Sequence, residues 1–124
     1  MISYKNRFHG HGALRYVSKN GTSIRSQYIT IKYLKNPRRK DSRLGVVVSK
    51  KVLKSAVGRN RIRRRVYEQL RLQLPQLQPG FDIVCFVASA QIRTLPTPEL
   101  IEIINAALQE AGIYKTIAKS DTIE

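Results

Sequence analysis

Cysteine is almost absent from this 124-residue chain, and acidic side chains, tryptophan and long apolar runs are scarce or missing as well. The single cysteine, Cys85, cannot form an internal disulfide bond, which excludes a disulfide scaffold and fits a reducing compartment. No apolar run approaches the roughly 20 residues that cross a bilayer, and the N-terminus shows no apolar stretch of a secretory signal. We therefore expect a soluble cytoplasmic protein without a membrane partner.

The scarcity of acidic residues makes charge the most informative property. Lys and Arg number 23 against 8 Asp and Glu, which gives a formal net charge of +15. The charge is segregated, because residues 1–71 carry 20 basic and 2 acidic side chains whereas residues 72–124 carry 3 and 6. Such a surface requires a polyanionic partner, and nucleic acid is favoured over an anionic membrane because Trp, a common interfacial anchor, is absent.

The apolar pattern predicts an α+β fold, an α/β two-layer sandwich, in a single domain over residues 1–115 with a flexible tail at 116–124. Alternation in residues 27–35 and a β-branched run in 43–49 predict two strands that form an antiparallel hairpin. The four-residue spacing of Ile62, Val66, Leu70 and Leu74 predicts a long helix. The other expected elements are a helix at 13–19, a short strand near 23–26, a strand at 81–89 and a last helix capped by Thr97.

An arginine run opens the long predicted helix, with five arginines among the seven residues 59–65. A helical projection turns most of them away from the apolar stripe and places Arg59 and Arg63 at its rim, where we expect packed stems and projecting guanidinium groups. Arginines crowded together without acidic neighbours repel one another unless an anion lies nearby, and guanidinium groups bind phosphate in a bidentate manner. The helix is therefore predicted to bind nucleic acid.

Two weaker signals accompany the arginine run. The polar face of the first predicted strand carries Tyr28, Thr30 and Lys32, which suits stacking of single-stranded RNA, although these could equally be ordinary sheet residues under the first helix. His9 and His11 fix no metal or acid–base geometry, and the carboxylates are too scattered for a two-metal nuclease. We therefore expect neither a catalytic residue nor a metal site in the protein.

Several segments together resemble the signature of the bacterial ribonuclease P protein component. They are Val48-Ser49-Lys50-Lys51, Ala56-Val57 and Arg59-Asn60-Arg61-Ile62-Arg63-Arg64, and the resemblance extends over residues 7–115. It implies a fold like the second domain of ribosomal protein S5, with order α-β-β-(β)-α-β-α and a left-handed crossover in place of the usual right-handed one. It also implies an RNA-binding subunit that assists a catalytic RNA in removing the 5′ leader from precursor tRNA.

The resemblance also implies partners and site residues. The partners would be the catalytic RNA and precursor tRNA, and the cofactor would be Mg²⁺ held mainly by RNA. The candidate RNA-binding residues are Lys50, Lys51, Arg59, Asn60, Arg61, Arg63, Arg64 and Arg65. The candidate residues of a leader-binding cleft between the first helix and the sheet are Arg7, Phe8, Leu14, Val17, Tyr28, Thr30 and Lys32. The chain departs from the family pattern at Leu14 and Ser18, where aromatic residues are common, at 53–55, and at Tyr67, where a basic residue is common.

Two other functions stay open at this point. A structural or assembly RNA-binding protein of the ribosome would share the basic surface but would not accelerate cleavage of precursor tRNA by a catalytic RNA. A stand-alone nuclease would cleave RNA without an RNA partner, and we expect no such cleavage.

Overall fold

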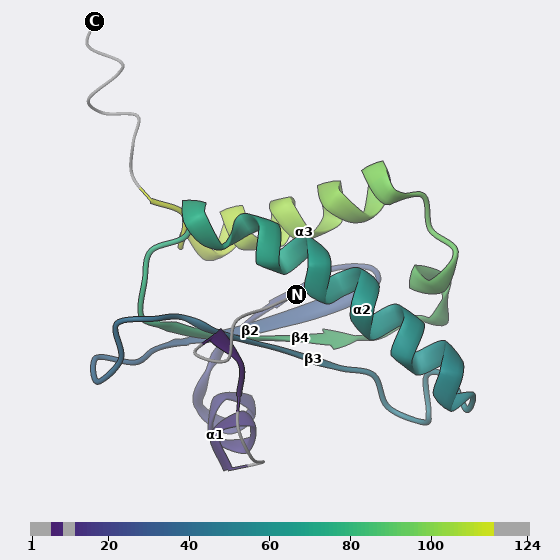
Figure 1. Ribbon diagram of the computed structural model, residues 1–124, viewed down its shortest axis with the longest axis horizontal. Coiled ribbons are helices and arrows are strands. Elements are labelled where there is room, and N and C mark those ends of the chain that lie inside the picture. The colour runs from purple at the N-terminus through teal and green to yellow at the C-terminus, as the bar shows by residue number, and fades with distance from the viewer. Residues whose placement is uncertain (1–5, 9–11, 116–124) are drawn as a thin grey trace, which may run out of the picture.

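The computed structural model describes residues 6–8 and 12–115 and contains a four-stranded sheet with helices on both faces (Figure 1). Its elements are α1 (Gly12–Asn20), β1 (Thr22–Arg25), β2 (Ile29–Lys35), β3 (Arg43–Val47), α2 (Ala56–Gln73), η2 (Leu74–Gln76), β4 (Phe81–Val87), η3 (Ala90–Arg93) and α3 (Thr97–Ala111). This order confirms the predicted α+β class, including the short strand β1. The predicted tail at 116–124 lies outside the described residues, as do His9 and His11.

The strand order is β1-β2-β4-β3, which contradicts one sequence prediction. The expected hairpin of β2 with β3 is wrong, because β4 lies between them, antiparallel to β2 and parallel to β3. The physical reason is burial: Ile83, Val84 and Cys85 are completely buried on both faces of β4, so this strand takes a central position. The hairpin forms instead between β2 and the mostly exposed β1.

The main core lies between the sheet and the two helices α2 and α3, which cover the same face (Figure 1). Alternate residues of the central strands, such as Ile31 of β2 and Cys85 of β4, point into it and are completely buried. The predicted apolar stripe of α2 is confirmed, because Ile62, Val66 and Leu70 are also completely buried. This packing fixes the orientation of α2 about its own axis and therefore decides which of its arginines reach solvent.

The opposite face of the sheet carries only α1 (Figure 1). Val17 of α1 and Val84 of β4 are completely buried on this side, apart from the main core. Lys32 of β2 strengthens the attachment, because its Nζ donates a hydrogen bond to the Ser18 carbonyl oxygen of α1 at 2.7 Å. The same ammonium group lies 5.4 Å from the centroid of the Phe86 ring. A short helix held by few buried groups thus forms one side of the predicted leader cleft.

Two helix ends carry residue types that favour a cap, and a third differs from its prediction. Ser55 caps α2, because its hydroxyl oxygen accepts a hydrogen bond from the Gly58 backbone N–H at 3.0 Å. Gly112 ends α3 in the left-handed conformation with φ of 72°, where glycine is favoured. Thr97 is not the expected cap, because α3 has no side-chain cap and the Thr97 hydroxyl accepts a hydrogen bond from Arg65.

Of the helices in residues 6–8 and 12–115, none is long and apolar enough to cross a membrane.

Candidate nucleic-acid interface

The outer side of α2 presents two arginines to solvent. Arg61 and Arg64 are both exposed, and neither has a hydrogen-bond or ion-pair partner among the residues that the structure describes. Lys50 and Lys51, in the loop that leads into α2, are exposed as well. These four cations are available to an external anion, so the structure is compatible with the sequence prediction for them.

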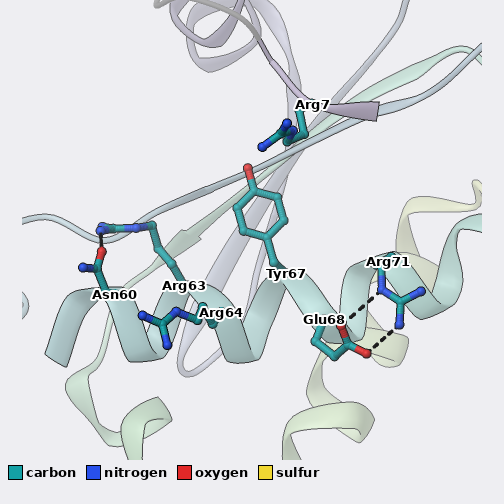
Figure 2. Close-up of a pocket in the computed structure, with 7 residues that line it drawn as sticks. All are labelled: Arg7, Asn60, Arg63, Arg64, Tyr67, Glu68 and Arg71. Carbon is teal, nitrogen blue, oxygen red and sulfur yellow. Dashed lines mark hydrogen bonds and ion pairs between the residues drawn. The ribbon is translucent and has the colours of Figure 1, made fainter. Parts of the chain in front are cut away.

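Asn60 and Arg63 interact with each other on the side of α2 that faces the edge of the sheet. The Arg63 Nη2 group donates a hydrogen bond to the Asn60 side-chain oxygen, one helical turn away (Figure 2). Asn60 is exposed and Arg63 is half-buried, which matches the rim position that the helical projection gave to Arg63. The pair stays accessible to a ligand because the guanidinium group retains unused donors.

Arg59 and Arg65 behave differently from the rest of the run, because their guanidinium groups bind the backbone of this chain. The Arg59 Nη1 group donates to the carbonyl oxygens of Leu53 and Lys54, at 2.9 and 2.7 Å. The projecting head expected for Arg59 is therefore wrong: the loop before α2 folds back far enough for its carbonyl groups to accept those donors. Arg65 donates in the same manner to one carbonyl oxygen of η3 and one in the segment after it. Both arginines are half-buried, and their roles in RNA binding stay predictions.

A hollow of about 460 Å³ lies between α2 and the N-terminal segment (Figure 2). Its lining residues are Arg7, Asn60, Arg63, Arg64, Tyr67, Glu68 and Arg71. Glu68 is the only carboxylate among them, and Arg71 engages both of its oxygens at 3.1 and 2.6 Å. This hydrogen bonding lowers the pKa of Glu68, so its carboxylate stays ionised. Four arginines against one carboxylate leave the hollow strongly positive.

Tyr67 forms the inner wall of this hollow. Its hydroxyl group donates a hydrogen bond to the Leu44 carbonyl oxygen of β3 at 3.2 Å, which ties α2 to the sheet. Burial raises the pKa of Tyr67, so the phenol stays neutral at physiological pH. The resemblance led us to expect a basic residue at this position, and Tyr67 instead makes a structural contact while the surrounding arginines keep the hollow positive.

Arg7 lines this hollow, whereas the sequence assigned it to the leader-binding cleft, and its role in leader binding stays a prediction. Arg7 forms an isolated parallel bridge with Leu44 at the outer edge of β3. Side chains alternate along an extended segment, so Arg7 points toward Tyr67 on the α2 side (Figure 2). The next residue, Phe8, points to the other face, where its ring lies 4.7 Å from the Arg43 guanidinium carbon.

Most of the remaining cleft candidates lie on the α1 face, with different exposure. Phe8 and Leu14 meet over Gly45, where a methyl group would lie within 3.1 Å of both side chains. Thr30 and Lys32 are half-buried, and Lys32 already binds α1. Val17 is completely buried, so it supports α1 and cannot touch a ligand, and Tyr28 packs against the main core. The structure therefore keeps Phe8, Leu14, Thr30 and Lys32 near the cleft and removes Val17 from it.

A second hollow beside α1 contains residues that the sequence reasoning missed. It is lined by Ala13, Tyr16, Leu34, Lys35, Asn36, Pro37, Arg38, Arg43 and Asp82. Tyr16 is 62% exposed, which is unusual for a large ring, and a helical projection of α1, which turns it about 100° away from the buried Val17, could have found it. Within residues 6–8 and 12–115 no group of three or more His, Cys, Asp or Glu side chains could hold a metal ion.

Comparisons with known proteins agree with this geometry. The family described as Ribonuclease P matches residues 2–112 of the chain. A protein of Roseiflexus sp. (strain RS-1) named "Ribonuclease P protein component" is 47% identical over 78 residues, covering 63% of this chain and 63% of that relative, so the match spans less than two thirds of the relative's length. A protein of the same name from Chloroflexus aggregans is 33% identical over 112 residues, covering 90% of this chain and 81% of the relative.

A solved structure agrees as well. The RNase P protein from Thermotoga maritima is 26% identical and superposes with a TM-score of 0.72, over 83% of this chain and 96% of that chain. All three similar proteins carry the same family name, so the comparisons do not favour the ribosomal alternative.

Proposed function

The chain belongs to the ribonuclease P protein family, and on that premise we propose that it is the RNA-binding subunit that assists a catalytic RNA in removing 5′ leaders from precursor tRNA. The observation that carries this proposal is the outer side of α2, where Arg61 and Arg64 are exposed and have no partner within residues 6–8 and 12–115. Arg64 is also one of the four arginines that line the adjoining hollow. Guanidinium groups at this density bind the phosphates of folded RNA. The proposed partners are therefore the catalytic RNA and its precursor tRNA substrate.

The chemistry in this proposal belongs to the RNA. Mg²⁺, which the family implies, supplies activation of the attacking water when it is bound. The α2 interface does not fit Mg²⁺ directly, because Glu68 is engaged by Arg71 and lies among guanidinium groups that repel a cation. The protein contributes electrostatics: its cations neutralise phosphates that would otherwise hold the catalytic RNA and the substrate apart.

In this proposal each face of the sheet binds a different RNA. The α2 face binds the catalytic RNA through Lys50, Lys51 and the exposed arginines. The opposite face, with Phe8, Leu14 and Thr30, receives the single-stranded leader, for which an aromatic ring and apolar side chains are suitable surfaces. Because Arg7 and Phe8 are consecutive residues pointing to different faces, the N-terminal segment contributes to both surfaces.

Reconstitution tests the proposal. The cognate ribonuclease P RNA is assayed for precursor-tRNA cleavage at low Mg²⁺, alone and with this protein, and the protein is also assayed without RNA. We expect the protein to accelerate cleavage by the RNA, because its cations replace part of the Mg²⁺ that screens the phosphates. We expect no cleavage by the protein alone. Equal rates with and without the protein would contradict the proposed function, and cleavage by the protein alone would favour a stand-alone nuclease.

A further inference from the structure

A cation from the acidic part of the chain lies beside the arginine helix. Residues 72–124 carry 3 basic side chains, and one of them, Arg93, ends the 3-10 helix η3. The completely buried Ile92 anchors η3, while the next side chain, Arg93, is exposed. Ser89 caps this short helix by accepting a hydrogen bond from the Gln91 backbone N–H at 3.1 Å. The position of Arg93 is thus fixed by the residues that precede it.

The Arg93 side chain lies against Gly58, in the first turn of α2. A methyl group at Gly58 would lie 3.4 Å from Arg93 Nη1, so the guanidinium group rests against the helix surface there. Gly58 and Arg61 are three residues apart and share one side of α2. Arg93 therefore lies at the edge of the surface that carries Arg61, and it has no hydrogen-bond or ion-pair partner among the described residues.

Arg65 connects η3 and the segment after it to α2. Its guanidinium group donates to the carbonyl oxygens of Ile92 and Leu95 and to the hydroxyl oxygen of Thr97. A guanidinium group is a rigid planar fork, so three acceptors arranged around it fix the segment in both distance and direction. Arg65, one of the two arginines of the run whose guanidinium groups bind the backbone, thus holds η3 and Arg93 in place.

We propose that Arg93 binds an RNA phosphate together with the exposed arginines of α2. Arg65 is the positioning residue that holds Arg93 beside them. The guanidinium groups of Arg61 and Arg93, which no other described residue neutralises, repel each other at this edge, and a phosphate between them relieves that repulsion. The N-terminal end of α2, which carries partial positive charge, lies at the same place and favours the same ligand. The inference rests on the proposed function, since it extends the surface offered to the catalytic RNA.

A salt series with the cognate ribonuclease P RNA tests the role of Arg93. We expect R93A to lower the slope of log affinity against log salt by ~0.9, which corresponds to about fivefold weaker binding at roughly 0.15 M salt. R93K keeps the charge and is expected to keep most of the slope. K115A is the matched control, because Lys115 is also exposed and follows α3, away from the N-terminal end of α2, so its removal is expected to leave the slope unchanged.

A double-mutant cycle tests the role of Arg65. R65K keeps the charge and the aliphatic stem, but an ammonium group cannot hold three acceptors in the geometry of a planar fork. We expect the R93A effect to shrink in the R65K background, whereas a purely structural Arg65 would change the melting temperature and leave the R93A effect at full size. Circular dichroism checks that each variant is folded.

The outcomes separate this inference from the proposed function. A wild-type slope in R93A, together with a lowered slope in R61A, would overturn the role of Arg93 and leave the α2 surface in place. Unchanged binding in both R93A and R61A would instead remove α2 from RNA binding. An R93A effect of the same size in both backgrounds would overturn the positioning role of Arg65.

Discussion

Arg43 of β3 and Asp82 of β4 are paired across the parallel strands and joined by two hydrogen bonds, from Nε to Oδ1 at 2.8 Å and from Nη2 to Oδ2 at 2.7 Å. Their side chains are only 14% and 5% exposed. The hydrogen bond to Asp82 raises the pKa of Arg43, so the guanidinium group stays charged. Asn36 also donates to Asp82, and Phe8 lies against the Arg43 guanidinium group. This ion pair therefore connects the loop after β2, both strands and the N-terminal segment.

Removing one partner of this ion pair is expected to destabilise the fold strongly. D82N leaves the Arg43 guanidinium group mostly buried without a counter-charge, and we expect a loss of ~3 kcal/mol in the free energy of unfolding, measured by urea denaturation. E68Q is the control, because it weakens the exposed Glu68–Arg71 pair, and we expect a nearly unchanged midpoint. A D82N midpoint equal to that of E68Q would show that the Arg43–Asp82 pair contributes little.

The exposed arginines of α2 are expected to determine the salt dependence of RNA binding. In R61A/R64A we expect the slope of log affinity against log salt to fall by ~1.8, because two phosphate contacts and their released counterions are lost. R25A/K115A removes the same charge from exposed residues outside α2 and is expected to keep the wild-type slope. Filter binding to the cognate ribonuclease P RNA at several salt concentrations measures the slope of each double variant. Equal slopes in the two double variants would mean that net charge alone attracts the RNA.

Neighbouring substitutions at the N-terminal segment are expected to have different effects. R7A removes a cation from the hollow beside α2 and is expected to weaken binding of the catalytic RNA. F8A changes the α1 face and is expected to weaken binding of precursor tRNA to the holoenzyme while leaving mature tRNA, which has no leader, unaffected. Fluorescence titrations with the two tRNAs distinguish these effects. A loss of affinity for mature tRNA in F8A would contradict the separation of the two surfaces.

Cys85 is expected to be unreactive in the folded protein. Burial raises the pKa of its thiol to about 12, so iodoacetamide should modify it only after denaturation. Above the unfolded value of about 8.5, the unfolded chain releases the thiol proton while the folded chain keeps it, so this thiol makes stability fall as pH rises toward 12. Thermal melts of wild type and C85V between neutral and alkaline pH measure that component, which C85V should lack. Rapid alkylation of the native protein would contradict the burial of this thiol.

Local periodicity predicted most of the fold, and strand pairing is where it failed. The spacing of Ile62, Val66 and Leu70 predicted both the helix and its buried side, because a helix presents every third or fourth residue to one face. The neighbours of β2 depend on which distant strand is buried on both faces, and no short window contains that information. The predicted β2–β3 hairpin was the simplest local choice, and β4 displaced it.

The sequence likewise predicted one part of the candidate site and missed another. The helical projection correctly turned Arg61 and Arg64 outward. It could not separate Arg65 from them, because the carbonyl groups that Arg65 binds lie about 30 residues further along the chain. Arg93 gave no signal, since a single cation in a mostly acidic segment resembles ordinary surface charge. An assumed extended conformation at Arg7 and Phe8 would have placed these two on opposite faces.

The slight attachment of α1 gives the two sides of the sheet different dynamics. Only Val17 of this nine-residue helix is buried, whereas α2 and α3 share an extensive core. Amide protons in α1 should therefore exchange with deuterated solvent through local opening, well before those of β4 or α2, which exchange only when the whole domain unfolds. The α1 face, which is proposed to bind leaders of varying sequence, is thus the face that can adapt. The arginines of α2 lie on the rigid face.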